Sequence, residues 1–371
     1  MTAPLFVLLA GGRWDGVQFG VHSIAAELAT RGRVLFVDPP MSVQAAVGAR
    51  RPILESVQDT LHVLRPVVPP GHSRPGTRRL AGTAMQRSVR WAARRLGGPV
   101  EAVIAFSPRF DVFGVCGERR RVYYAKDDVA SGAKLMGVDA NALERAEQRC
   151  AETADVLVAA SEEIARRWRE RGHDALLIPN GVDFDHCATA SSRPKPADVG
   201  LSGPIAGFVG HLSKRIDPAY LDAVASTGIS LLLVGPRQQT LDPRAFDEVL
   251  GRPNVQWLGQ RPYADLPAYL GVIDVGLVPY AASAFNTGSF PLKILQHLAA
   301  GRALCSTDLP AVRWLRTDLI DIATSPSSFA SAVERRAARP PSAAEVAARQ
   351  ELARTHDWSV RVDQLVDAVR S

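Results

Sequence analysis

The sequence contains no long hydrophobic run, no metal-binding cysteine pattern and no dinucleotide fingerprint. None of its apolar segments approaches the ~18–20 residues of a membrane-spanning helix, and LFVLLA near the N-terminus is too short for a signal-peptide core and is typical of a buried strand. The four cysteines are scattered without C-x-x-C spacing, which excludes a recognisable zinc site and is typical of reduced thiols. We therefore expect a cytoplasmic protein.

Acidic residues are absent from one long basic segment. The net charge is +6, and seven arginines lie between residues 72 and 100 without an acid. These are Arg74, Arg78, Arg79, Arg87, Arg90, Arg94 and Arg95. A basic helix over 74–95, with Trp91 in it, could rest on the inner face of an anionic membrane or receive an anionic lipid-linked acceptor. A solvated helix packed on a sheet is the other interpretation, and the lack of basic–aromatic alternation argues against nucleic acid.

The length of 371 residues suits two domains, and a hydrophobic content of 46% is that of a globular protein. Short apolar runs alternate with helical patterns throughout, which predicts an α/β fold of two doubly wound parallel sheets. The pattern divides the chain into an N-terminal domain over 1–185, a Ser-, Pro- and Ala-rich linker over 186–203, a second domain over 204–342 and a helical segment over 343–371.

The most informative segment is FNTGSFPLKILQHLAAG, at residues 285–301. It predicts a polar loop containing Gly288, followed by a helix from Pro291 to Ala300. Unpaired N–H groups at the start of the helix, with Lys293 in the first turn, would hold an anion such as a diphosphate. An ordinary loop-to-helix entry is the competing interpretation of this segment taken alone.

Ligands of open α/β sheets bind beyond the carboxyl ends of the strands, so residues that follow strands are the candidates. In the second domain three glycines, Gly210, Gly235 and Gly259, follow predicted strands and would allow a ligand close to the backbone. Cations near them could neutralise phosphate oxygens. These cations are Lys214, Arg215, Arg261 and Lys293. Solvated charges on surface turns are the alternative.

In the first domain the strand RVYYA ends at Asp127 and Asp128, whose carboxylates could act as a base or as ligands of sugar hydroxyls. His22 and Arg109 are further candidates, although each residue alone is more often structural. The glycine-rich segment after the first strand, with Gly12 and Trp14 in it, is not G-x-G-x-x-G, which argues against a nicotinamide or flavin cofactor. The D-x-D of residues 183–185 follows Asn-Gly and is better explained by turn and capping roles than by a metal.

Taken together, these motifs resemble the nucleotide-sugar-dependent glycosyltransferases of the two-domain GT-B fold. The chain is most similar to the family 4 branch, of the teichuronic-acid and polysaccharide biosynthesis type. The resemblance rests on YYAKDD, ADVLVAAS, PNGVD, GFVGHLSKRID, LLLVGP, VIDVGLVPY and PLKILQHLAAG, in this order. It implies two Rossmann-like domains facing across a cleft, with the donor in the second domain and the acceptor in the first. It also implies that the last helix, around Trp358, returns to the first domain.

The resemblance also assigns roles to residues. Gly210, Lys214 or Arg215, and the 286–293 loop with Ser289 would contact the diphosphate, while the Gly259–Arg261 loop would lie near the base. The family commonly carries two glutamates eight residues apart in this loop and helix. Here Gly288 and Gln296 occupy those positions, so Gln296 would hold the ribose and no carboxylate serves the first role. Retention of configuration and independence of a metal are what the resemblance implies.

The sequence therefore predicts a glycosyltransferase that moves a sugar from a nucleoside-diphosphate sugar to a hydroxyl of a saccharide, a lipid-linked saccharide or a small metabolite. Lys214, Arg215 and Lys293 would stabilise the leaving diphosphate, and Asp127 and Asp128 would organise the acceptor or sugar. Gly12, Trp14, His22 and Arg109 are expected on the acceptor side. A nucleotide-sugar epimerase, a non-catalytic nucleotide-sugar-binding protein and a dinucleotide oxidoreductase are the alternatives.

Overall fold

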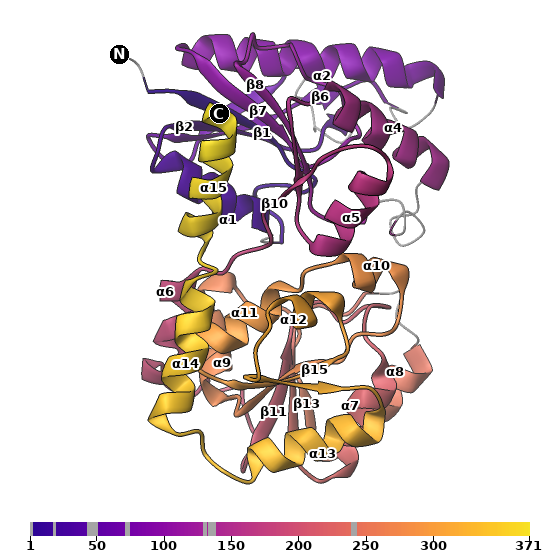
Figure 1. The fold of residues 1–371 in the computed structure, drawn as a ribbon, viewed down its shortest axis with the longest axis vertical. Coiled ribbons are helices and arrows are strands. Elements are labelled where there is room, and N and C mark those ends of the chain that lie inside the picture. Colours follow the sequence, from indigo (N-terminus) through magenta and orange to yellow (C-terminus); the bar gives the residue numbers. More distant parts are fainter. Residues whose placement is uncertain are drawn as a thin grey trace. The chain divides into compact units, whose positions relative to one another are not determined.

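The structure is a computed structural model, and it describes residues 3–17, 20–42, 51–70, 75–128, 132, 139–238 and 243–371. The chain folds as two compact units. The first comprises Met1–Pro179 together with Arg361–Ser371, and the second comprises Asn180–Val360. Each unit has its own sheet (Figure 1). Each also has its own hydrophobic core. No helix of the described residues is long and apolar enough to cross a membrane.

The first unit is built on an eight-stranded sheet in the order β10-β9-β8-β7-β1-β2-β5-β4. Its strands are β1 (Leu5–Leu9), β2 (Arg33–Val37), β4 (Ile53–Ser56), β5 (Leu61–Arg65), β7 (Val100–Ala105), β8 (Arg120–Ala125), β9 (Val156–Ala159) and β10 (Leu176–Leu177). Neighbouring strands run parallel except β4, which pairs antiparallel with β5 at the edge. A separate two-stranded sheet joins β3 (Met41–Ser42) to β6 (Val67–Val68).

The strand order of this sheet reverses beside β1. The chain proceeds from β1 to β2 and β5 on one side, and it later adds β7, β8 and β9 on the other. The topological switch point therefore lies between β1 and β7, which pair in parallel. Ligands of such sheets bind outside the carboxyl ends of the strands at this point.

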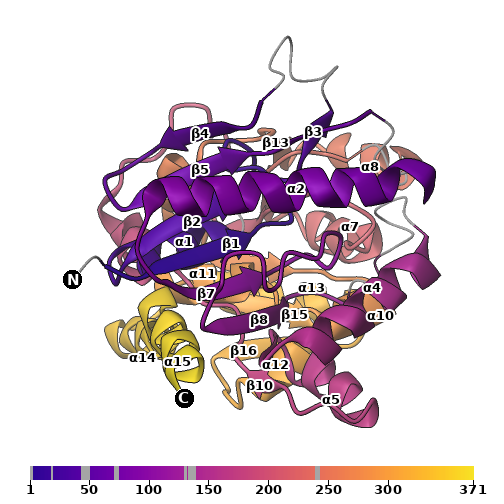
Figure 2. The same ribbon diagram turned by 90° about the horizontal axis from the view of Figure 1, so that it is seen from above.

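Helices cover both faces of this sheet, which is why its central strands are continuous apolar runs. The helices are α1 (Gly20–Ala29), α2 (Pro75–Leu96), α4 (Ala140–Thr153) and α5 (Glu162–Glu170). Alternate residues of β1, such as Leu5 and Val7, pack in one cluster with Met85 and Val89 of α2. Figure 2 shows α2 lying over β2 and β5, and α1 also packs against these strands.

The chain ends in α15 (Trp358–Arg370), whose residues from Arg361 onward belong to the first unit. There the Nη2 of Arg31 donates to Asp363 at 2.7 Å. The sequence predicted one helical segment over 343–371, whereas the structure has α14 (Ala343–Arg354) and then α15. The helices are separated because the carboxylate of Asp357 accepts the N–H of Ser359 at 2.8 Å and thereby starts a new helix.

The second unit contains a six-stranded sheet, entirely parallel, in the order β13-β12-β11-β14-β15-β16. Its strands are β11 (Ile205–Val209), β12 (Ser230–Val234), β13 (Val255–Trp257), β14 (Val275–Val278), β15 (Ala303–Thr307) and β16 (Ile320–Ala323). The order reverses between β11 and β14. This unit therefore has its own switch point, at the carboxyl ends of those two strands.

The helices of the second unit form two groups (Figure 1). One group contains α7 (Pro218–Ser226), α8 (Pro243–Leu250) and α13 (Pro326–Ala337), of which α7 contacts both of the others. The other group contains α6 (Phe184–Ala188), α9 (Leu266–Val272), α11 (Leu292–Ala299) and α14. The short helices α10 (Ala284–Gly288) and α12 (Pro310–Trp314) contact each other.

Two segments differ from the sequence-based expectation. The chain passes from one unit to the other between Pro179 and Asn180, upstream of the predicted linker over 186–203. Cys187 of that segment is fully buried in the second unit's core, an apolar contact that the segment's polar composition concealed. The predicted loop before α11 contains a helix, α10, because the Ser283 hydroxyl accepts the N–H of Asn286 and caps it.

Candidate functional site

At the carboxyl edge of the second sheet, three strands are followed by glycines, which place no side chain of their own over the backbone there. Gly210 follows β11, Gly235 follows β12 and Gly259 follows β13. Gly210 N–H donates to the carbonyl of Val234 at 2.8 Å, and Gly235 N–H donates to that of Gly259 at 2.7 Å. Gly235 has φ +138°, and a Cβ there would lie 2.0 Å from the carbonyl oxygen of Gly210. Any side chain at 235 would therefore displace the neighbouring backbone, so this edge needs glycine.

Lys293 lies against this bare edge, in the first turn of α11. A Cβ at position 210 would lie 2.8 Å from its Nζ, so the glycine makes room for the ammonium group. The Nζ donates to the hydroxyl of Tyr280 at 2.6 Å and lies 5.0 Å from the ring centroid of Phe208. Pro291 precedes α11, and no side chain of the described residues caps the helix there. The ammonium group and the start of the helix thus place positive charge at one point.

Arg215 is fixed beside Lys293 by neutral partners. Its Nε donates to Asn286 Oδ1 at 2.8 Å, and its Nη2 donates to Ser289 Oγ at 2.7 Å. Asn286 is fully buried, and its Nδ2 donates back to the carbonyl of Arg215 at 2.9 Å. The guanidinium also lies 4.7 Å from the ring centroid of Tyr280, the residue that holds Lys293. Because these partners are neutral, Arg215 keeps its positive charge for a ligand.

The pKa of His211 reflects both its burial and the positive charge at this edge of the sheet. Burial, and after it the charges of Lys293 and Arg215, lower the pKa of the His211 imidazole. The ring therefore stays neutral at pH 7, and the positive charge at the edge comes from the lysine and the arginine. A site of this kind suits an anion with several phosphate oxygens.

The remaining predicted residues of the second unit differ in their exposure and in their partners. Lys214 is exposed, and Gln296 is half-buried on α11, one turn after Lys293. Gly288 is buried at the end of α10, so it offers backbone alone. Arg261 donates to the carboxylate of Asp198 at 2.8 Å, an ion pair that neutralises it. The structure thus joins Gly210, Arg215, Ser289 and Lys293 in one cluster, whereas Arg261 is committed to a carboxylate.

In the first unit, Trp14 of the loop after β1 packs against His22 of α1. Their ring centroids lie 5.3 Å apart, and both rings pack on Phe36 of β2. His22 is 3% exposed, and its Nε2 lies 3.1 Å from the carbonyl oxygen of Arg13. These contacts give Trp14 and His22 a packing role, and Gly12 is half-buried just before them.

The two aspartates after β8 have different environments. Asp128 forms an ion pair with Arg167, which also pairs with the fully buried Glu147 at 3.1 Å. The hydroxyl of Tyr123 donates to the same glutamate at 3.0 Å. Both aspartates are half-buried, but Asp128 is held by this ion-pair network, whereas Asp127 forms no ion pair within the described residues. Of the two, Asp127 is the better placed to meet a ligand.

The structure adds two residues that the sequence reasoning did not select. Tyr280 follows β14 by two positions and contacts both Lys293 and Arg215, so the same rule of examining strand ends could have identified it. Asp38 follows β2, is 2% exposed and accepts the N–H of Trp14 at 2.8 Å. Burial raises the pKa of its carboxyl group, although it lies 3.6 Å from Arg65.

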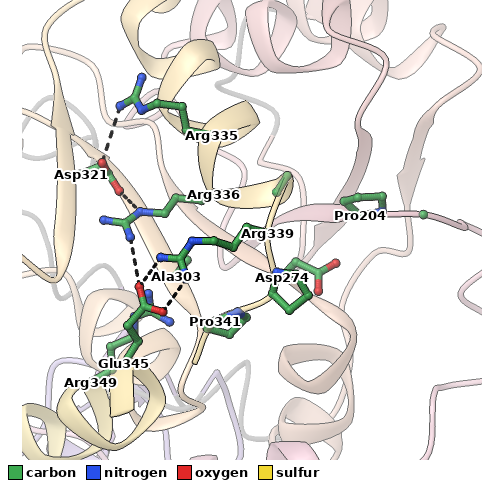
Figure 3. Close-up of a pocket in the computed structure, with 13 residues that line it drawn as sticks. Pro204, Asp274, Ala303, Asp321, Arg335, Arg336, Arg339, Pro341, Glu345 and Arg349 are labelled. Atoms are coloured by element: carbon green, nitrogen blue, oxygen red, sulfur yellow. Dashed lines mark hydrogen bonds and ion pairs between the residues drawn. The ribbon is translucent and has the colours of Figure 1, made fainter. Parts of the chain in front are cut away.

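A cavity of about 520 Å³ lies at the opposite edge of the second sheet (Figure 3). Asp274 and Ala303, which line it, stand at the amino ends of β14 and β15. Three of the four arginines that line it are paired with acids, and Arg339, for example, lies 2.7 Å from Glu345 (Figure 3). The fourth, Arg349, donates to the carbonyl oxygen of Gly301 at 3.2 Å. The cavity is therefore separate from the carboxyl edge, and its charges are largely neutralised from within.

The described residues contain no group of three or more His, Cys, Asp or Glu side chains that could hold a metal ion. The D-x-D segment has the capping role that its sequence context indicated. Asp183 is the N-cap of α6, and its carboxylate accepts the N–H of His186 at 3.2 Å.

Comparison with known proteins identifies the type of domain. Residues 203–338 match the model of the family described as Glycosyl transferases group 1. TuaH of Bacillus subtilis, whose name assigns it to teichuronic acid biosynthesis as a glycosyltransferase, is 27% identical over 234 residues. The match covers 60% of this chain and 59% of TuaH, so the chain spans less than two thirds of that relative.

Solved structures show the same fold at low sequence identity. Sucrose-phosphate synthase from Thermosynechococcus elongatus superposes with a TM-score of 0.74 at 16% identity, covering 99% of this chain and 98% of that one. HepE of Anabaena, solved in complex with UDP and glucose, gives a TM-score of 0.71 at 16% identity and covers both chains fully, at 100%. These likenesses confirm the predicted fold of two Rossmann-like domains.

Proposed function

We propose that this chain, whose residues 203–338 match a glycosyl transferases group 1 domain within a GT-B fold, transfers a sugar from a nucleoside-diphosphate sugar to an acceptor hydroxyl. The observation that carries the proposal is the placement of Arg215 and Lys293. Both lie at the carboxyl edge of the second sheet, beside glycine backbone and the start of α11. Because HepE was solved with UDP, UDP is the nucleotide to test first.

The proposed chemistry follows from where charge develops. When the bond between the sugar and the diphosphate breaks, negative charge accumulates on the leaving diphosphate. Lys293 and Arg215 would stabilise it. Arg215 is already oriented by Asn286 and Ser289, so little reorganisation accompanies the reaction. The start of α11 would add about 0.3–2 kcal/mol. We include independence of a catalytic metal in the proposal, because these groups supply the positive charge.

The sugar-binding part of the site departs from the two-glutamate pattern of similar enzymes. Gly288 is buried at the end of α10 and supplies no side chain, while Gln296 is half-buried on α11. We propose that Gln296 binds a ribose hydroxyl and that Asp127 of the first unit organises the acceptor or the sugar. Transfer with retention is part of the same proposal.

We also propose that α2 makes peripheral contact with an anionic membrane. In the described part of this helix, Leu80 is 62% exposed and Trp91 is 41% exposed, with exposed arginines such as Arg87 and Arg94 around them. Arg74, which belongs to the predicted basic segment, lies outside the described residues. An apolar and cationic face suits anionic lipid headgroups, and it would bring the chain to a lipid-linked acceptor.

The test is an assay of UDP release from UDP-sugars, run with and without saccharide and lipid-linked acceptors. We expect release that requires an acceptor, persists in EDTA and falls at least tenfold in Lys293→Ala. That fall corresponds to the loss of a charge-assisted hydrogen bond. Lys195→Ala, which removes an exposed lysine of the same unit, is the matched control. Conversion of the donor without acceptor would indicate an epimerase, and binding without turnover would indicate a non-catalytic protein.

A further inference from the structure

A second cavity, of about 180 Å³, lies in the first unit among α2, α4 and the segment that follows β7. Three arginines, one from each of these elements, line it: Arg78 from α2, Arg109 from the segment after β7 and Arg149 from α4. All three side chains are exposed at its rim. The three elements thus bring together arginines that lie far apart in the sequence.

These three guanidinium groups are uncompensated. Within the described residues, none of them has a carboxylate within ion-pair distance, whereas Arg121 of the same unit pairs with Asp155 at 2.6 Å. One acid, Asp111, also lines the cavity, and its Oδ1 accepts the N–H of Phe113 at 3.2 Å. The cavity therefore carries an excess of positive charge that the protein leaves unneutralised.

The floor of the cavity is small and neutral. Ala146 and Cys150 of α4 line it and are 2% and 6% exposed. Burial raises the pKa of the Cys150 thiol to about 12, so the sulfur carries no charge at pH 7. A tetrahedral group with several acceptor oxygens fits such a cavity, because the planar guanidinium fork of arginine matches phosphate oxygens in pairs.

We propose that this cavity binds the phosphoryl group of an anionic acceptor. That the phosphoryl group belongs to the acceptor rests on the proposed function. That the cavity binds a phosphoryl group rests on the three arginines alone. Arg109 follows β7 at the carboxyl edge of the first sheet, and Asp127 follows the neighbouring β8 at the same edge. A phosphoryl group held by the cavity would therefore direct the rest of the acceptor toward that edge, where sheets of this kind bind their ligands.

The experiment uses the full chain and glycerol 3-phosphate as the probe, with binding measured by isothermal titration calorimetry. We expect saturable binding that weakens at least tenfold in Arg149→Ala and in Arg109→Ala, as for loss of a charge-assisted hydrogen bond. Arg145→Ala is the matched control, because it removes an exposed arginine of α4 that does not line this cavity. Lys293→Ala tests whether the probe binds at the other anion site. Both controls should bind as wild type does.

Equal binding by Arg149→Ala, Arg109→Ala and Arg145→Ala, or loss of binding in Lys293→Ala alone, would overturn the inference. Vesicles of phosphatidylcholine with and without phosphatidylglycerol distinguish the source of the phosphoryl group. Binding to the anionic vesicles that weakens in Arg149→Ala indicates a lipid acceptor. Vesicle binding that is unchanged in Arg149→Ala comes from α2, and glycerol 3-phosphate binding that still depends on Arg149 then indicates a soluble acceptor. UDP titrated into the same variants separates the two proposals. UDP binding without glycerol 3-phosphate binding contradicts this inference alone, and the reverse contradicts the donor site alone.

Discussion

We predict that His297 makes the free energy of unfolding of the second unit depend on pH. The residue follows Gln296 on α11 and is fully buried, and neither ring nitrogen has a hydrogen-bond partner within the described part of the chain. Gly276 of β14 faces the ring, since a Cβ there would lie 2.4 Å from the imidazole Cγ. Burial, followed by the charges of Lys293 and Arg302, lowers the pKa of His297 to about 3.

The sign and size of the effect follow from this shift. In the unfolded chain the imidazole takes up a proton near its ordinary pKa of 6.5, whereas in the folded protein it stays neutral down to about 3. The unfolded state therefore binds more protons in this range, and the free energy of unfolding falls as the pH is lowered. Below about pH 6.5, the free energy of unfolding falls by roughly 1.4 kcal/mol for each pH unit. Between about pH 7 and pH 5, the loss due to His297 is thus about 2 kcal/mol.

The assay compares urea unfolding of the wild type and of His297→Leu at these two pH values. Leucine removes the titrating group and also the unsatisfied nitrogens, so the variant should lose about 2 kcal/mol less than the wild type on acidification. It should also be at least as stable at pH 7, because a buried polar group without a partner is removed. An identical loss in both proteins would show that His297 is not buried in its neutral form, and the reasoning would be refuted.

Three further predictions concern the candidate site. Gly235→Ala should lower the free energy of unfolding by about 1–3 kcal/mol in calorimetry, because φ is +138° and the new Cβ meets a carbonyl oxygen at 2.0 Å; unchanged stability would contradict the close approach at this edge. Asn286→Ala should weaken UDP binding about tenfold by releasing Arg215, and binding equal to wild type would show that the arginine needs no support. Asp128→Asn should lower the free energy of unfolding, measured in urea, by about 1–3 kcal/mol, because it breaks the ion pair with Arg167. Asp127→Asn should instead reduce turnover and leave the free energy of unfolding unchanged. The opposite pattern would show that the two aspartates have exchanged roles.

Much of the fold could be predicted because buried parallel strands are continuous apolar runs. Leu5–Leu9 and Val100–Ala105 are such runs, and both are strands. The rule that ligands meet the residues after strands selected Gly210 and Arg215, and both lie after β11 at one edge of the second sheet. By contrast, β4 could not be predicted in this way, because its residues are mostly exposed and do not form an apolar run. It pairs antiparallel with β5 at the edge of the sheet.

The parts of the site that were missed depend on partners distant in the sequence. Asn286 and Arg215 are 71 residues apart, and their hydrogen bond is what converts a predicted loop into a rigid support. Likewise, Arg261 was a plausible phosphate ligand by position, yet Asp198, 63 residues away, holds its guanidinium. Periodicity indicates which residues form strands and helices, but it does not indicate which side chains meet.

The most direct test of the donor site is calorimetric titration of UDP, GDP and dTDP into the wild type, Lys293→Ala and Lys195→Ala. We predict that at least one of these nucleotides binds the wild type and Lys195→Ala equally well and binds Lys293→Ala at least tenfold more weakly. Absence of binding by all three nucleotides, or equal binding by the two lysine variants, would contradict a diphosphate site at the carboxyl edge of the second sheet.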